Sequence, residues 1–285
     1  MIDHSGWIER LVPANGIRQH IWRTGGDKPP VVCLPGFSEI GLTWSRTARA
    51  LADRFDVIMV DFRGQGRTEV GLDGYGQDTL TRDVAALIDA LGLDRVAVMG
   101  FSNGGGVAAQ LGAEHPDRVR CLVLEDPGWG PKIGGKTMGE SPQYRAWYDS
   151  HIAWLEAFQR LPADEQEKQI MERLPPGGAS WAREDVLGFA ESMAQYNLGF
   201  AKRGMALWNE SDKAVRDLVS AIRAPTLLMV SKAALMPGAP NPIDDIRTSV
   251  STRPNVTLME FETGHFIRRE AFDRFIEAAA RALKV

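Results

Sequence analysis

The sequence contains little that would point to a metal, a membrane or a disulfide. It has only two cysteines, Cys33 and Cys121, and each lies in an apolar run typical of a strand, so two buried thiols are expected. The five histidines form no HxxxH or HxH cluster, which argues against a zinc enzyme. No apolar run approaches the ~20 residues of a membrane span, and Met1–Ser5 lack the features of a secretory leader. We expect a cytoplasmic protein with no membrane partner and no metal.

An excess of basic charge is also missing. The chain has 33 Lys and Arg against 37 Asp and Glu, a net charge of −4, which disfavours binding to nucleic acid or to anionic lipid. Its 44% hydrophobic and 25% charged residues are ordinary for a globular protein and exclude a disordered or fibrous chain. At 285 residues, the sequence fits one large α/β domain that carries an insertion.

Short β-branched runs alternate with longer helical patterns over the first 125 residues and return near the end of the chain. Strands are predicted at 17–22, 31–34, 57–60, 96–99, 121–124, 225–231 and 256–261. Helices are predicted at 42–54, 79–91, 104–114 and 268–283. This alternation predicts right-handed crossovers and a parallel sheet covered on both faces. Ligands of such sheets bind beyond the carboxyl ends of the strands.

The alternation stops between residues 127 and 217, where the pattern is helical and broken by glycine and proline. This stretch holds five of the eight tryptophans and three of the four tyrosines. We therefore predict an α/β core at 1–126 and 218–285, and a helical cap at 127–217 that covers the ligand-binding edge. The alternative is that these aromatic residues form only a satellite core.

One motif carries the chemistry. The predicted strand at 96–99 runs into Gly100-Phe101-Ser102-Asn103-Gly104, and a helix follows. This is G-x-S-x-G in its strand–turn–helix context, in which the serine hydroxyl projects above the sheet from a strained turn. The helix N-terminus directs free N–H groups toward developing negative charge. The motif predicts that Ser102 is a nucleophile.

With this motif, the chain resembles the α/β-hydrolase family. Pro35-Gly36-Phe37 stands where the family usually has His-Gly-x, residues 61–68 (DFRGQGRT) are similar to its D-x-R-G-x-G-x-S turn, and Gly264-His265-Phe266 matches its histidine loop. The resemblance implies a mostly parallel eight-stranded sheet flanked by helices, with an inserted cap. It also implies a serine hydrolase that needs no cofactor, with His265 as the base.

A carboxylate must orient the histidine, and here the sequence departs from the commonest family pattern, because no acid follows the strand after the cap. An acid does end the strand before the cap, a position that some members use, among them zearalenone-type lactone hydrolases. We predict Asp126 as this acid, with Glu125 and then Asp245 as alternatives. The resemblance places the oxyanion hole at the backbone N–H groups of Phe37 and Asn103.

The aromatic cap predicts an apolar substrate, an aromatic or lipophilic ester or lactone. Candidate substrate-binding residues are Trp129, Tyr144, His151, Trp154 and Phe266. Carbon–carbon bond hydrolases and cofactor-free perhydrolases share the same triad and remain alternatives, as does a hydrolase-like receptor. The chain is expected to be a monomer or a homodimer.

A dehydrogenase is a further alternative. Residues 104–109 (GGGVAA) satisfy G-x-G-x-x-A after a strand, and Glu125 follows at a spacing near that of a ribose-binding acid. The glycines begin five residues after the predicted strand ends, whereas an NAD-binding turn is tight. The NAD alternative also leaves the other matched motifs unexplained.

Overall fold

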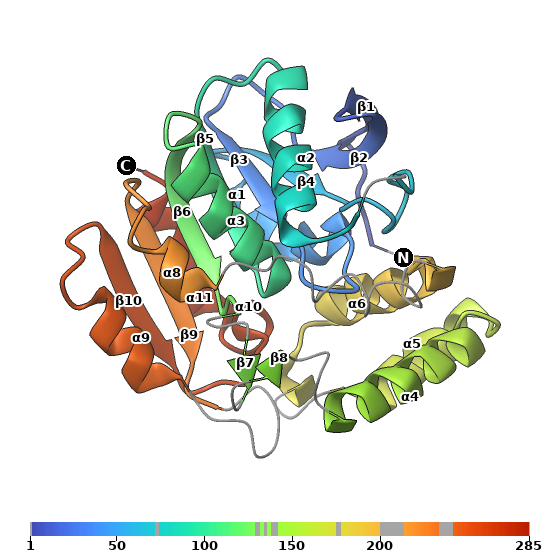
Figure 1. The fold of residues 1–285 in the computed structure, drawn as a ribbon. Coiled ribbons are helices and arrows are strands. Elements are labelled where there is room, and N and C mark those ends of the chain that lie inside the picture. The colour runs from blue at the N-terminus through green and yellow to red at the C-terminus, as the bar shows by residue number, and fades with distance from the viewer. Residues whose placement is uncertain are drawn as a thin grey trace.

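The structure is a computed structural model that describes residues 2–71, 74–128, 132–133, 136–137, 142–174, 178–199, 214–233 and 242–284. Its centre is one eight-stranded sheet with helices on both faces (Figure 1). The strands are β1 (Ile8–Ala14), β2 (Ile17–Arg23), β3 (Pro30–Leu34), β4 (Asp56–Val60), β5 (Val96–Phe101), β6 (Val119–Glu125), β9 (Thr226–Ser231) and β10 (Val256–Phe261).

The spatial order of these strands is β1-β2-β4-β3-β5-β6-β9-β10. The β1–β2 and β2–β4 pairs are antiparallel and the other pairs are parallel. The predicted mostly parallel eight-stranded sheet is therefore confirmed. The parallel strands end at one edge, so the residues that follow β3, β5, β6, β9 and β10 can meet there.

Helices cover both faces because successive strand residues point to opposite sides. Val32 and Leu34 of β3 pack into one apolar cluster, and Val31 and Cys33 pack into the other. The first cluster includes α2 (Gln77–Ala90), α3 (Asn103–Glu114), α8 (Val215–Leu218) and α9 (Ile243–Val250). The second includes η1 (Gly41–Trp44), α1 (Ser45–Leu51), α10 (Ile267–Glu270) and α11 (Phe272–Ala282). Both cysteines are buried and unpaired, as predicted.

The segment between β6 and β9 is mainly helical. It contains a two-stranded hairpin, β7 (Lys132–Ile133) with β8 (Lys136–Thr137), and then α4 (Pro142–Phe158), α5 (Ala163–Glu172), η3 (Gly178–Ser180) and α6 (Arg183–Gln195). Helices α4, α5 and α6 contact one another and share a third apolar cluster. We call α4–α6 the cap helices. Val215 and Leu218 of α8 pack with the sheet instead, and the division of the chain at 127 and 217 stays a prediction.

The first strand and the last predicted helix differ from the sequence prediction. Strand β1 was not predicted, because most of its residues are exposed and its apolar alternation is weak. The single helix predicted at 268–283 is two helices, α10 and α11. Ala271 lies between them with φ −134° and ψ 50°, outside the helical region. Within the described ranges, no helix is both long and apolar enough to cross a membrane.

Candidate active site

Ser102 occupies the turn between β5 and α3, and its backbone is strained. It has φ 51° and ψ −115°, values that a non-glycine residue rarely adopts. The Ser102 N–H donates to the Glu125 carbonyl at 2.9 Å, and its carbonyl accepts the Gly106 N–H at 3.1 Å. These two bonds hold the turn between the end of β6 and the first turn of α3.

Two glycines make this turn possible. A Cβ on Gly100 would lie 2.2 Å from the Gly104 carbonyl oxygen, and one on Gly104 would lie 2.4 Å from the Leu34 carbonyl oxygen. Both positions therefore exclude any side chain, as the G-x-S-x-G motif requires. The close approach also brings the start of α3 against the end of β3, where the loop with Phe37 begins.

Asp126 pairs with His265. Its Oδ2 lies 2.6 Å from His265 Nδ1, and its Oδ1 accepts the Ser231 N–H at 2.9 Å. Asp126 has φ 41°, a left-handed conformation that aspartate tolerates better than most residues. Its own N–H donates to the Met229 carbonyl at 2.8 Å. The turn after β6 thus directs the carboxylate across the end of β9 toward the loop after β10.

The histidine loop is held from both sides. The Gly264 N–H donates to Glu270 at 2.7 Å, and Ser231 Oγ donates to the Thr263 carbonyl at 2.6 Å. The His265 ring packs against Phe101, the residue before Ser102, with ring centroids 4.7 Å apart. Ser231 therefore orients the acid through its N–H and the histidine loop through its hydroxyl. Sequence reasoning missed this residue, although Ser231 ends the strand on which the usual family acid was sought.

This arrangement can support base chemistry. A carboxylate can only accept, so Asp126 favours the neutral tautomer of His265 that carries its hydrogen on Nδ1, and in that tautomer Nε2 has the lone pair. The two side chains are 16% and 19% exposed, so the pair is sheltered but open enough for a substrate to reach.

The two alternative acids have other partners. Glu125 is completely buried and accepts from the Arg268 backbone N–H at 2.8 Å and from Arg268 Nη1 at 2.9 Å. Burial raises the pKa of Glu125 above its ordinary value, although Arg268 opposes this. Asp245 lies half exposed in the first turn of α9, 3.7 Å from Arg216.

The candidate oxyanion donors lie at two element ends. Asn103 is the first residue of α3, directly after Ser102. Phe37 lies in the turn that follows β3, and its ring faces two cap tyrosines, with centroids 6.2 Å from Tyr148 and 5.8 Å from Tyr196. Phe37 thus places the candidate oxyanion loop against the cap helices.

The predicted substrate-binding residues fall into three groups. Phe266 packs against Trp181 with centroids 5.0 Å apart, beside His265. His151 and Trp154 stack at 5.6 Å, and the Trp154 indole donates to Gln169 of α5 at 3.3 Å. Burial lowers the pKa of His151 to about 4. Trp129 lies outside the described residues, and so does the side chain of Tyr144.

Tyr148, Tyr196 and Trp181 are further residues at the cap side of the site, and sequence reasoning did not single them out. A signal existed for Tyr148. It heads a stripe with Ile152 and Leu155 at helical spacing, and all three side chains are buried in the cap cluster. The sequence could not show that this stripe faces Phe37, because that depends on how α4 packs in the tertiary structure.

The glycines of residues 104–109 pack against protein. They lie inside α3, where a Cβ on Gly104 would strike the Leu34 carbonyl and one on Gly105 would lie 2.8 Å from Pro127 Cβ. The close approach that these glycines permit is therefore to the protein's own backbone and to Pro127, whereas an NAD-binding turn would use its glycines to approach the dinucleotide. Among the described residues, no three His, Cys, Asp or Glu side chains gather as metal ligands do.

Comparisons with known proteins agree with this fold. Residues 29–170 match the family described as alpha/beta hydrolase fold. N-formylmaleamate deformylase of Pseudomonas putida is 29% identical over 94% of this chain and 93% of its own. The pimeloyl-[acyl-carrier protein] methyl ester esterase of Aeromonas hydrophila is 28% identical over 78% of this chain and 84% of its own.

One solved structure is similar to this chain over nearly the full length of both. The N-formylmaleamic acid deformylase of Pseudomonas putida S16 superposes with a TM-score of 0.73, at 25% identity over 96% of this chain and 99% of its own. The sheet and the segment that carries the cap helices therefore both lie within the shared fold.

Proposed function

Because the chain belongs to the α/β-hydrolase fold family, and its relatives include a deformylase and a methyl ester esterase, we propose that it hydrolyses a carboxylic ester or lactone through an acyl-enzyme on Ser102. The observation that carries this proposal is the 2.6 Å contact between Asp126 and His265 beside the strained turn of Ser102. A lactone is a cyclic ester, so one mechanism serves both substrates.

In the proposed cycle, Ser102 Oγ attacks the substrate carbonyl while His265 Nε2 takes its proton. Asp126 stabilises the imidazolium that forms. The backbone N–H groups of Phe37 and Asn103 stabilise the oxyanion. His265 then protonates the leaving alcohol, and a water deprotonated by the same nitrogen attacks the acyl-enzyme and releases the acid.

The substrate is proposed to be apolar at its acyl or alcohol group. Aromatic rings around the proposed machinery support this: Tyr148 and Tyr196 pack against Phe37, and Trp181 packs against Phe266, which contacts His265. His151 is neutral at pH 7, since its pKa is lowered to about 4, so it adds no charge to the cap helices.

A second candidate reaction is hydrolysis of a formyl amide. It is favoured by the similarity to the P. putida deformylase over nearly the whole of both chains. The same serine and histidine would serve, with His265 protonating an amine in place of an alcohol. Comparing turnover of matched ester, lactone and N-formyl substrates decides between the reactions.

The test of the proposal is covalent labelling and turnover. A fluorophosphonate probe is expected to label wild-type protein once, at Ser102, and p-nitrophenyl esters are expected to be hydrolysed. Ser102→Ala should lose both. Unlabelled wild-type protein, or ester turnover that survives in Ser102→Ala, contradicts a serine mechanism. A thermal shift with NAD(H) would instead support the dehydrogenase alternative.

A further inference from the structure

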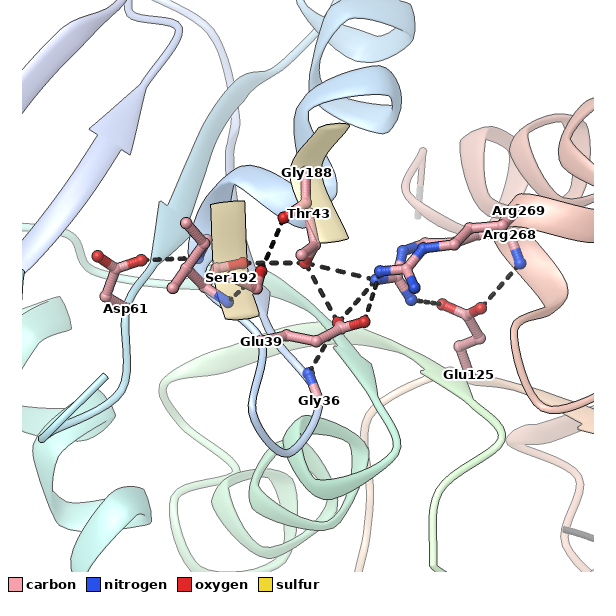
Figure 2. Close-up of polar contacts among 11 residues, drawn as sticks. Gly36, Glu39, Thr43, Asp61, Glu125, Gly188, Ser192, Arg268 and Arg269 are labelled. Carbon is pink, nitrogen blue, oxygen red and sulfur yellow. Dashed lines mark hydrogen bonds and ion pairs between the residues drawn. The ribbon is translucent and has the colours of Figure 1, made fainter. Parts of the chain in front are cut away.

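A buried network of charges lies behind the proposed site. Hydrogen bonds and ion pairs join Glu39, Glu125, Arg268 and Arg269 (Figure 2). Each of these residues is at most 1% exposed. They come from the turn after β3, the end of β6 and the helix α10 that follows the histidine loop. The network is thus built from three segments that each carry one of the proposed catalytic groups.

Glu39 closes the turn that contains Phe37. Its backbone N–H donates to the Gly36 carbonyl at 3.2 Å, and its side-chain Oε2 accepts the Gly36 N–H at 3.3 Å. Both backbone groups of Gly36 are therefore bound by one residue. Phe37 and Ser38 lie between these bonds, and the Phe37 N–H is the proposed oxyanion donor.

The turn is strained. Ser38 has φ 60° at the third position of the turn, a place that usually holds glycine or asparagine. A non-glycine residue keeps such a conformation only where the surroundings enforce it. The turn is also confined on the sheet side, since a Cβ on Gly36 would lie 2.7 Å from the Phe101 ring.

Two arginines hold the Glu39 carboxylate. Oε2 lies 3.0 Å from Arg268 Nη2, Oε1 pairs with Arg269 Nη2, and Thr43 Oγ1 also donates to Oε2. Burial alone would raise the pKa of Glu39, but Arg269 and Arg268 hold it below its ordinary value. The carboxylate is therefore charged and has little freedom to rotate.

Arg268 joins this turn to the rest of the site. Its Nη1 binds Glu125, which directly precedes Asp126, and Arg268 itself comes three residues after His265. Among the described residues, Arg269 Nε and Nη1 have no hydrogen-bond partner, and both are buried where the guanidinium packs on the rings of Trp181, Phe189 and Phe266. Unpaired buried donors reduce stability, so maximal stability is a poor explanation for this network.

We propose that Glu39 is a positioning residue: anchored by Arg268 and Arg269, its carboxylate holds the Gly36–Glu39 turn so that the Phe37 N–H faces the oxyanion. This inference rests on the proposed serine mechanism. It assigns Glu39 no contact with the substrate. Its effect passes through the backbone of Gly36 and Phe37.

The test compares two buried carboxylates near the same guanidinium. Glu39→Gln keeps one oxygen for the Gly36 N–H, but it loses the charge and turns an NH2 donor toward a guanidinium, so the arginines no longer anchor the side chain that holds the turn. Asp185→Asn removes the charge of a residue that is 4% exposed, pairs with Arg46 at 2.9 Å and interacts electrostatically with Arg269. Asp185 lies on α6. Both variants lose one buried negative charge, and only the first loosens the turn.

The readout is the rate of fluorophosphonate labelling, in which the Ser102 Oγ–P bond forms, the P–F bond breaks and His265 takes the Oγ proton. Glu39→Gln is expected to label about 10- to 100-fold more slowly than wild type, somewhat less than the loss on deleting an oxyanion donor. Asp185→Asn should stay within about threefold of wild type, since the donors are unmoved. Melting temperatures of both variants report any general loss of stability.

Two more variants separate positioning from stability. Glu39→Asp keeps the charge between the arginines but is too short to reach the Gly36 N–H, so labelling should fall while the protein stays folded. Adding Ser38→Gly to Glu39→Gln relieves the strained φ and should restore part of the labelling rate. Equal labelling of wild type and Glu39→Asp, or equal losses in Glu39→Gln and Asp185→Asn, overturns the proposal. Wild type that is not labelled overturns the serine mechanism instead.

Discussion

Asp126 and Glu125 are neighbours with the same functional group, yet their surroundings give them different tasks. Asp126 leaves β6 with φ 41° and binds His265 and the Ser231 N–H, at the accessible end of the sheet. Glu125 is the last residue of β6 and points to Arg268 in the interior. Side chains alternate along a strand, so adjacent carboxylates reach opposite partners.

We predict that Asp126→Asn slows ester hydrolysis. The amide cannot stabilise the imidazolium or enforce the Nδ1–H tautomer of His265, so kcat for ester hydrolysis should fall by about 10⁴-fold. The fold should persist, because Asn keeps an oxygen for the Ser231 N–H. Steady-state kinetics and circular dichroism check this. Asp245→Asn is the control and should keep wild-type rates; the reverse pattern would move the acid to α9.

Helix α3 shows how one element links the nucleophile to the oxyanion loop. It begins directly after Ser102, and its glycines allow contact with the backbone at the end of β3. Gly104 and Gly106 lie in the same helix but in different surroundings. The Gly104 Cβ position lies 2.5 Å from the Pro35 carbonyl oxygen, whereas the Gly106 position lies 3.4 Å from Gln77 Oε1.

We therefore predict opposite outcomes for two matched substitutions in α3. Gly104→Ala must displace the loop that leads to Phe37, so it should lower the unfolding free energy by about 1–3 kcal/mol and slow the labelling of Ser102. Gly106→Ala should be neutral or stabilise by up to about 1 kcal/mol, because alanine favours a helix. Denaturant unfolding measures both. A tolerated Gly104→Ala with unchanged labelling would contradict the close packing.

A second charged cluster lies away from the site, near the edge of the sheet. His20 is buried in β2, with Nδ1 2.7 Å from Asp61 and Nε2 2.9 Å from Glu9. Burial alone would lower the pKa of His20, but its hydrogen bonds and ion pairs with Asp61 and Glu9 raise it above its ordinary value. Asp61 also accepts the Gly41 N–H at 2.7 Å, which fixes the start of η1.

A raised pKa in the folded state makes stability depend on pH. The contribution of charged His20 is fully present below its unfolded pKa of about 6.5 and is lost as pH rises through the folded pKa. His20→Gln should therefore destabilise the protein more at pH 6 than at pH 9, as urea unfolding would show. Glu9→Gln removes one carboxylate partner and should shrink that difference. An equal loss at both pH values would mean that His20 is neutral in the fold.

The sequence by itself determined the parts that depend on local sterics and periodicity. Alternating apolar runs predicted the parallel sheet, and the two glycines around Ser102 predicted its strained turn, because both follow from neighbouring residues. Only the tertiary structure decided that Asp126 meets His265, that Ser231 holds both, and that Glu39 pairs with Arg268 and Arg269. The residues of these pairs lie 105 to 230 positions apart in the chain. Their contacts depend on the order of the strands in the sheet and on the positive φ angles of Ser38 and Asp126, which no residue pattern specifies.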